Sequence, residues 1–228
     1  ARKYDGNVIV HVGASSTREA VELAEHAADV GADAVSSMPP ANKGIDLLVS
    51  YYTDISTAAQ IPLLVYHIPI LTGLTLSVEQ MLRLVDIDGV CGFKFSDWNL
   101  FFMNQVLLAR PETVVFNGND EFICPGLLYG ASGGIGMNYN FFPKLFLGVY
   151  ETVNKGDIAR AMELQNLFLS YAAVLWKYGI REGFTILMRE LGYAEYSWRR
   201  PRPRLDEQTR KQFLLDVRPK LEAIEQAV

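Results

Sequence analysis

One lysine stands inside a segment that otherwise has the composition of a buried β-strand. Lys94 lies between Phe93 and Phe95 in the stretch GVCGFKFSDW, residues 89–98. Strand alternation directs the two phenylalanines to one face and Lys94 to the other. Such a lysine either reaches out of the strand end into solvent or serves a reaction, because lysine is almost never fully buried without a partner. Desolvation favours the uncharged amine, which can attack a ketone and form a Schiff base.

A tyrosine at a second predicted strand end could supply a proton. Tyr66 ends the apolar run LLVY and precedes His67 and a proline, where the chain must turn. A phenol beside an imine can pass protons between substrate oxygens and solvent. Taken alone, a strand tyrosine is more often a packing residue with its hydroxyl hydrogen-bonded. Other polar residues follow the remaining predicted strands: His11, Ser96, Asp97, Asn117, Asp120, Glu121, Asn138 and Tyr139.

The elements that must position these residues follow from the hydrophobic pattern. Short β-branched runs alternate with longer segments of helical period, which predicts a parallel α/β fold. Strands are expected at residues 7–12, 34–38, 63–68, around Phe93, 113–116 and 133–137. Helices are expected at residues 16–30, 45–59, 78–85, 98–108 and through Leu128, with capping boxes at Ser16 and Ser77. In such folds ligands bind at the C-terminal ends of the strands, where the polar residues lie.

The last third of the chain has a helical pattern only. Helices are expected at residues 144–153, 157–178, 182–191 and 206–227. The stretch WRRPRPR, residues 198–204, is interpreted as a solvated connector rather than a nucleic-acid patch, because the whole protein is acidic. We therefore expect barrel units over residues 1–140, and a last barrel helix with a helical extension over residues 141–228.

Composition excludes several classes of function. The chain has 228 residues, half of them hydrophobic, with a net charge of −5 and a pI near 5.3. This balance disfavours a nucleic-acid partner, and no apolar run approaches the roughly 20 residues that span a bilayer. The polar N-terminus lacks the apolar core of a secretory signal, so a cytoplasmic location is expected. Cys91 and Cys124 are interpreted as reduced packing residues.

Two further patterns give weak signals. The glycine-rich stretch GASGGIG, residues 130–136, lacks both the lysine of a P-loop and the spacing of a dinucleotide fingerprint. The three histidines, His11, His26 and His67, do not have the spacing of metal ligands, so no metal is expected.

Four motifs in order carry a family resemblance. They are YHIPILTG (residues 66–73), GFKFSD (92–97), NGNDE (117–121) and GASGGIGMNYN (130–140). Together they resemble the class I pyruvate aldolases of the N-acetylneuraminate lyase and dihydrodipicolinate synthase superfamily. The opening stretch, residues 8–35, is similar to the third βα unit of that family.

The resemblance implies a (β/α)₈ TIM barrel with extra C-terminal helices. It also implies a Schiff base between pyruvate and Lys94, with Tyr66 as the proton relay and no cofactor beyond this covalent imine. By the same resemblance Ser96, Gly118, Asp120 and Glu121 line the substrate site, and the implied assembly is a homotetramer. Asp120 and Glu121 are equally compatible with an acidic pair at a helix N-terminus.

Two positions indicate a branch of the superfamily. Leu71 stands where dihydrodipicolinate synthases carry an arginine for their second substrate, so the resemblance favours the lyase branch and an N-acetylneuraminate-like 2-keto acid. Met137 stands where the lyases have a serine in their substrate site, and a thioether cannot donate a hydrogen bond. A dihydrodipicolinate synthase-like enzyme, a 2-keto-3-deoxy sugar acid aldolase or a dehydratase therefore stays open, as does a noncatalytic 2-keto-acid-binding or regulatory relative.

The length is short for the implied fold. About 250 residues is typical of a complete barrel, and the first two βα units of the family, including the Gly-Thr-Thr type turn that holds the pyruvate carboxylate, have no counterpart in this sequence. We expect the six strands to correspond to strands 3 to 8 of a longer polypeptide.

Overall fold

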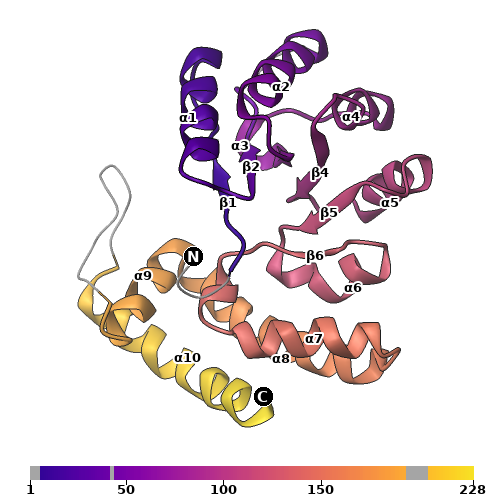
Figure 1. Ribbon diagram of the computed structural model, residues 1–228. Helices are drawn as coiled ribbons and strands as arrows, with labels where there is room; N and C mark the ends of the chain where they lie inside the picture. Colours follow the sequence, from indigo (N-terminus) through magenta and orange to yellow (C-terminus); the bar gives the residue numbers. More distant parts are fainter. Residues whose placement is uncertain (1–5, 42–43, 194–204) are drawn as a thin grey trace. The chain divides into compact units, whose positions relative to one another are not determined.

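A computed structural model describes residues 6–41, 44–193 and 205–228 of the chain (Figure 1). The chain divides into two compact units, residues 1–138 and residues 139–228. The connector predicted at residues 198–204 lies outside the described residues.

The first unit is a parallel sheet with helices between its strands. The strands are β1 (Ile9–His11), β2 (Ala34–Ser37), β3 (Leu63–His67), β4 (Val90–Phe95), β5 (Val114–Asn117) and β6 (Gly133–Gly134). Each strand pairs in parallel with the next one in the sequence, so the sheet order is β1 to β6 without a crossover. The intervening helices are α1 (Thr17–Asp29), α2 (Ile45–Ala59), α3 (Pro69–Thr72), α4 (Val78–Val85), α5 (Leu100–Ala109) and α6 (Ile123–Leu128).

The strands curl, and helices α1, α2, α4, α5 and α6 cover the outer side of the curl (Figure 1). This arrangement is a partial barrel of the (β/α) type. Within the described residues, β1 and β6 are the two edges of the sheet, which leaves the curl open between them. The predicted alternation of strands and helices is thus confirmed, and the described sheet has six strands.

Side-chain capping fixes the starts of several helices. The Ser16 hydroxyl accepts a hydrogen bond from the Glu19 backbone N–H at the start of α1. At α4, Ser77 and Gln80 exchange the two hydrogen bonds of a capping box, as the sequence predicts. The helix predicted to begin at Trp98 begins at Leu100, because the Asn99 side chain accepts from the Phe102 N–H and caps it.

The outer face of the sheet carries the hydrophobic core. Alternate strand residues face the helices, and the buried strand members of this core include Val35, Leu63, Val65, Phe93, Phe95 and Val115. Buried residues of α2, α4 and α5, including Leu48, Tyr52, Ile55, Met81, Leu84, Met103 and Val106, pack against them. By the same alternation, the inner face receives the intervening residues of each strand. The polar candidates on the strands therefore divide between a buried outer face and a partly open inner face.

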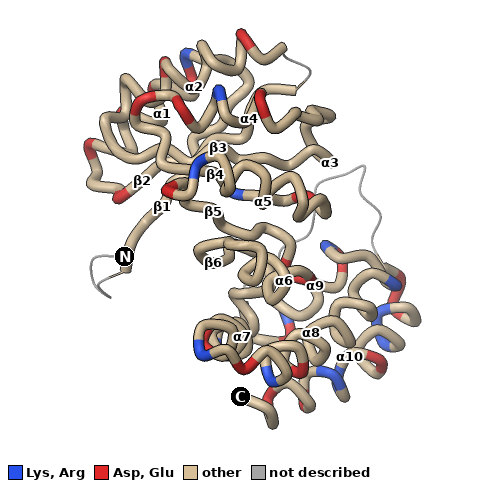
Figure 2. The backbone as a smooth tube through the Cα atoms, turned by 90° about the vertical axis from the view of Figure 1, so that its right-hand side faces the viewer, with Lys and Arg blue, Asp and Glu red and all other residues tan. Residues whose placement is uncertain are grey.

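The second unit is helical, with α7 (Pro143–Asn154), α8 (Ile158–Tyr178), α9 (Ile180–Glu190) and α10 (Glu207–Ala227), close to the predicted ranges. Aromatic rings join α7 to α8: Phe146 and Phe168 have ring centres 4.9 Å apart. Lys177 on α8 lies 2.8 Å from Asp216 on α10 and lowers the pKa of that carboxyl to about 2. Figure 2 shows that charges of both signs are interspersed along α8 and α10. No helix among the described residues is long and apolar enough to cross a membrane.

Candidate active site

Tyr66 and Lys94 occupy paired positions on adjacent strands. In the register of β3 and β4, Tyr66 lies opposite Lys94 and His67 lies opposite Phe95. The Lys94 Nζ lies 4.3 Å from the centre of the Tyr66 ring. Both side chains are half-buried on the inner face, whereas Phe93 and Phe95 are completely buried on the outer face. The structure therefore brings the two main sequence candidates into contact and leaves the amine partly accessible.

His11 joins this pair from β1, and the sequence analysis did not assign it a role in the site. Its ring lies edge-on to Tyr66, with ring centres 6.1 Å apart. The His11 Nε2 accepts a hydrogen bond from the Met38 backbone N–H at 3.2 Å, which fixes the ring. Partial burial lowers the pKa of His11, and the positive charge of Lys94 lowers it further. The sequence signal for this role is that Ile9 and His11, two residues apart at a strand end, point to the same face, which is the inner one.

Asp120 contributes a buried carboxylate after β5. It stands at the start of a short 3₁₀ segment, Asp120–Phe122, and is only 5% exposed. Its Oδ2 accepts hydrogen bonds from the backbone N–H and the side-chain amide of Asn138, each at 2.8 Å. Burial raises the pKa of Asp120, while the Asn138 hydrogen bonds and the charge of Lys94 oppose the rise. The carboxylate is thus held in one orientation, within electrostatic range of the lysine.

Ser96 and Gly118 form a tight corner next to Lys94. The Gly118 N–H donates to the Phe95 carbonyl at 2.7 Å, which pairs the ends of β4 and β5. A Cβ at Gly118 would collide with the Ser96 Oγ and would lie 3.1 Å from the Lys94 Cε. The Ser96 hydroxyl is buried and has no hydrogen-bond partner among the described residues. A bound molecule at this corner could supply that partner.

The glycine-rich segment, residues 130–136, contacts the Asp120 carboxylate. Gly136 lies against Asp120, because a Cβ at Gly136 would overlap the carboxylate. Met137 and Glu121 are half-buried and adjoin this contact in the chain. The negative charge of Glu121 also favours the protonated form of Asp120 and raises its pKa. Glu121 and Met137 therefore lie next to the Asp120 cluster.

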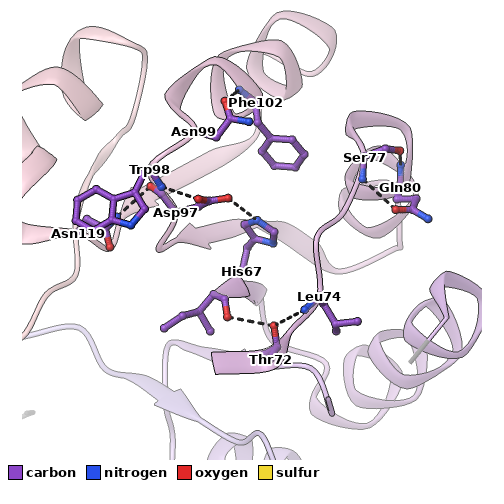
Figure 3. Close-up of polar contacts among 11 residues, drawn as sticks. His67, Thr72, Leu74, Ser77, Gln80, Asp97, Trp98, Asn99, Phe102 and Asn119 are labelled. Carbon is purple, nitrogen blue, oxygen red and sulfur yellow. Dashed lines mark hydrogen bonds and ion pairs between the residues drawn. The ribbon is translucent and has the colours of Figure 1, made fainter. Parts of the chain in front are cut away.

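A second polar cluster includes His67, Asp97 and Asn119 (Figure 3). Strand alternation places His67 on the face opposite to that of Tyr66. The His67 Nε2 lies 3.6 Å from the Asp97 Oδ2, and the His67 side chain is only 4% exposed. Burial lowers the pKa of His67, and the Asp97 carboxylate opposes this effect. The Asn119 side-chain amide donates to the Asp97 carbonyl at 3.0 Å. The sequence patterns assign none of these residues a role in the site.

The remaining candidates lie elsewhere. Leu71 on α3 is exposed. Burial raises the pKa of the Cys91 thiol and of the Cys124 thiol. Within residues 6–41, 44–193 and 205–228, no group of three or more His, Cys, Asp or Glu residues is placed to hold a metal ion.

The chemistry open to the inner face follows from its components. A lysine amine and a phenol are in contact, and the His11 imidazole lies edge-on to the phenol. A buried serine hydroxyl and an oriented carboxylate lie close by. An amine can form a covalent bond to a carbonyl carbon, and the phenol can transfer the protons that this reaction requires. The other groups can bind the oxygens of a polar substrate.

Comparisons with known proteins show the family to which the chain belongs. The model of the dihydrodipicolinate synthetase family matches residues 3–219. N-acetylneuraminate lyase of Salmonella paratyphi B is 36% identical over 184 residues, which are 79% of this chain and 62% of that protein. The chain therefore spans about three fifths of the length of the curated relatives it matches.

Two solved structures share the fold. A crystal structure of CdNal from Clostridium difficile in complex with mannosamine has a TM-score of 0.90 at 25% identity, covering 96% of this chain and 76% of that one. A catalytic lysine mutant of the Ruminococcus gnavus sialic acid aldolase has a TM-score of 0.84 at 27% identity, covering 97% and 73%. Since the family model spans nearly the whole sequence, the chain belongs to the dihydrodipicolinate synthetase family.

Proposed function

We propose that this protein is a class I aldolase that reversibly cleaves an N-acetylneuraminate-like 2-keto acid to pyruvate and an aldehyde sugar. The observation that carries the proposal is the 4.3 Å contact between the Lys94 amine and the Tyr66 ring on the inner face of the sheet. The curated relatives are carbon–carbon lyases by name, which supports the same reaction class.

Lys94 is the nucleophile in this mechanism. Its uncharged amine attacks the ketone carbon, and the carbonyl oxygen leaves as water, which yields a protonated imine. Removal of the proton from the C4 hydroxyl then breaks the bond between C3 and C4, and the imine accepts the electron pair. The aldehyde leaves and an enamine remains. Protonation of the enamine carbon and hydrolysis of the imine release pyruvate and restore the amine.

Tyr66 transfers the protons in these steps. Its phenol lies beside the imine position and can donate to the departing hydroxyl and accept from the C4 hydroxyl. His11 orients the Tyr66 ring by its edge-on contact. Because burial and the Lys94 charge both lower the pKa of His11, it adds no second positive charge next to the amine at neutral pH. Lysine chemistry of this kind uses no cofactor other than the covalent imine.

The remaining inner-face groups favour a hydroxylated substrate. Ser96 offers a buried hydroxyl that lacks a partner in the described structure, and Asp120 offers a carboxylate fixed by Asn138. We assign the polyol part of the substrate to Ser96, Gly118, Asp120 and Glu121. The Met137 thioether cannot donate a hydrogen bond to a substrate hydroxyl. A 2-keto-3-deoxy sugar acid is therefore the second candidate substrate. The exposed Leu71 offers no cation for a second carboxylate, which disfavours a dihydrodipicolinate synthase reaction.

The proposal includes a larger assembly. We propose that β1 to β6 correspond to strands 3 to 8 of an eight-stranded barrel, because the sheet is open between β1 and β6 and the chain covers 76% of the Clostridium difficile neighbour. Two further βα units would close the curl and remove its exposed edges. A homotetramer stays a prediction from the family resemblance. The intact mass and the oligomeric mass of the native protein test these points.

Pyruvate release from N-acetylneuraminate by the native protein tests the proposed activity. We expect turnover in the wild type and none above background in Lys94→Ala. Lys155→Ala is the matched control, because Lys155 is an exposed lysine whose ammonium pairs with Glu151 on α7. A panel of 2-keto sugar acids then ranks the two substrate candidates. Cleavage by Lys94→Ala at the wild-type rate would contradict the mechanism.

A further inference from the structure

His67 and Asp97 form a cluster next to the proposed catalytic pair, Tyr66 and Lys94, but on the outer face of the sheet. His67 follows Tyr66 in β3, and Asp97 stands three residues after Lys94, just beyond β4. Alternation along the strand places His67 on the outer face and Tyr66 on the inner face. One side-chain contact, between the His67 Nε2 and the Asp97 Oδ2 at 3.6 Å, therefore joins the ends of the two strands that carry Tyr66 and Lys94.

The His67 ring packs against two aromatic rings that also stack on each other. It stacks on Phe95 with ring centres 5.8 Å apart and planes 12° apart, and on Phe102 at 5.3 Å and 18°. The planes of the three rings are nearly parallel, and the imidazole Nε2 points toward Asp97 (Figure 3). Stacking contributes packing energy but provides no hydrogen bond, so Asp97 supplies the polar partner that a buried imidazole requires.

Asp97 is in turn fixed by two hydrogen bonds that involve the backbone. Its Oδ1 accepts from the Trp98 N–H at 2.6 Å, and its carbonyl accepts from the Asn119 side-chain amide at 3.0 Å. Asn119 follows β5, so this contact extends the cluster to a third strand end. Between His67 and Asp97, the Ser96 N–H donates to the His67 carbonyl at 2.8 Å. These contacts therefore link the ends of the strands that carry the inner-face groups.

We propose that His67 and Asp97 are positioning residues for imine formation: they hold the ends of β3 and β4 in the register that keeps the Lys94 amine against the Tyr66 phenol. This inference rests on the aldolase activity proposed above. Neither side chain touches the substrate in this assignment. Their contribution comes through geometry, and a displacement of about 1 Å between reacting groups can cost on the order of a hundredfold in rate.

The test uses borohydride trapping of the pyruvate imine as a function of pyruvate concentration, in the native protein. The variants are Asp97→Asn, which keeps the shape of the side chain and removes its charge, His67→Gln and the double variant. We expect each single change to lower the trapping rate at saturating pyruvate roughly tenfold, with less than about a twofold change in the half-saturating concentration. The double variant is expected to be no slower than the worse single variant, because the two residues act as one unit.

Asp86→Asn is the matched control. It removes a carboxylate from the exposed ion pair of Asp86 and Arg110, which lies elsewhere among the helices that cover the sheet. The thermal midpoint of each variant is measured alongside. A purely structural role would lower the midpoint and leave the saturating rate unchanged, and that result would overturn the inference. Should His67→Gln not fold, Asp97→Asn alone carries the comparison, with Asp97→Glu expected to restore part of the rate.

The two proposals fail in distinguishable ways. If the wild type forms no adduct at Lys94, the aldolase proposal and the positioning role fall together. If the wild type forms the adduct and the variants form it equally fast, only the positioning role falls.

Discussion

Tyr66 and Lys94 lie opposite each other on adjacent parallel strands, with the lysine amine 4.3 Å from the centre of the tyrosine ring. The parallel register produces this contact, since strand ends meet at the same edge of the sheet and alternation sends both side chains to the inner face. The outer-face neighbours of the two residues are buried in the hydrophobic core, which anchors the backbone from behind. The reactive groups thus stand on rigid strands rather than on loops.

Tyr66→Phe removes the phenol and keeps the ring. We expect the rate of pyruvate release to fall by about 10²–10⁴-fold, the usual contribution of a general acid or base. Imine formation at Lys94 should persist at a reduced rate, because the amine is still present. Tyr129→Phe, which alters an exposed tyrosine, provides the control. Unchanged turnover in Tyr66→Phe would rule out the proton-transfer role.

Gly118→Ala tests the tight corner next to the lysine. The added methyl group would collide with the Ser96 hydroxyl and would press on the Lys94 Cε. We expect a loss of stability of about 1–3 kcal/mol, as for other overpacked sites, together with a larger loss of activity. Gly44→Ala is the comparison, because nothing lies within 4 Å of its added Cβ. Equal activity of the two variants would show that Lys94 has more room than the structure indicates.

Stability should fall as the pH is lowered through the range of histidine titration. Burial lowers the folded-state pKa of His67 and His11 below the ordinary value of 6.5, so the unfolded state binds more protons in this range. The stabilisation is therefore fully present above about pH 6.5 and is lost as the pH falls toward the folded-state values. Thermal midpoints between about pH 8 and pH 5 measure it.

His67→Gln should flatten this dependence, since the variant lacks the most deeply buried of the three histidines. His26→Gln, which changes an exposed residue of α1, should keep the wild-type slope. Asp97→Asn should steepen the loss at low pH, because the carboxylate opposes the lowering of the His67 pKa. Parallel curves for the wild type and His67→Gln would contradict this assignment.

Sequence patterns predicted most of the fold, because the elements obey local rules. The helix α2 and the helix α4 have the predicted bounds, and the Ser77 capping box is present. The helix α3 (Pro69–Thr72) replaces the turn that the sequence predicts at Pro69, because proline is well suited to the first helical position. The glycine-rich strand is shorter than predicted, with only Gly133 and Gly134 paired to β5.

The site was predictable where strand register alone brings residues together. Lys94 and Tyr66 each stood at a predicted strand end, and the parallel order of the sheet placed them side by side. His11 reaches Tyr66 across an intervening strand, β2, and that distance depends on the curl of the sheet. The contact of His67 with Asp97 depends on the rotamers that Phe95 and Phe102 allow, which no sequence pattern encodes.

The most direct measurement is reduction of the native protein with borohydride in the presence of pyruvate, followed by mass spectrometry of the intact chain and of its peptides. A Schiff base at Lys94 predicts one reduced pyruvate group per chain, located on the peptide that contains Lys94 and absent from Lys94→Ala. An unmodified chain, or an adduct that persists at other lysines in Lys94→Ala, would contradict the account.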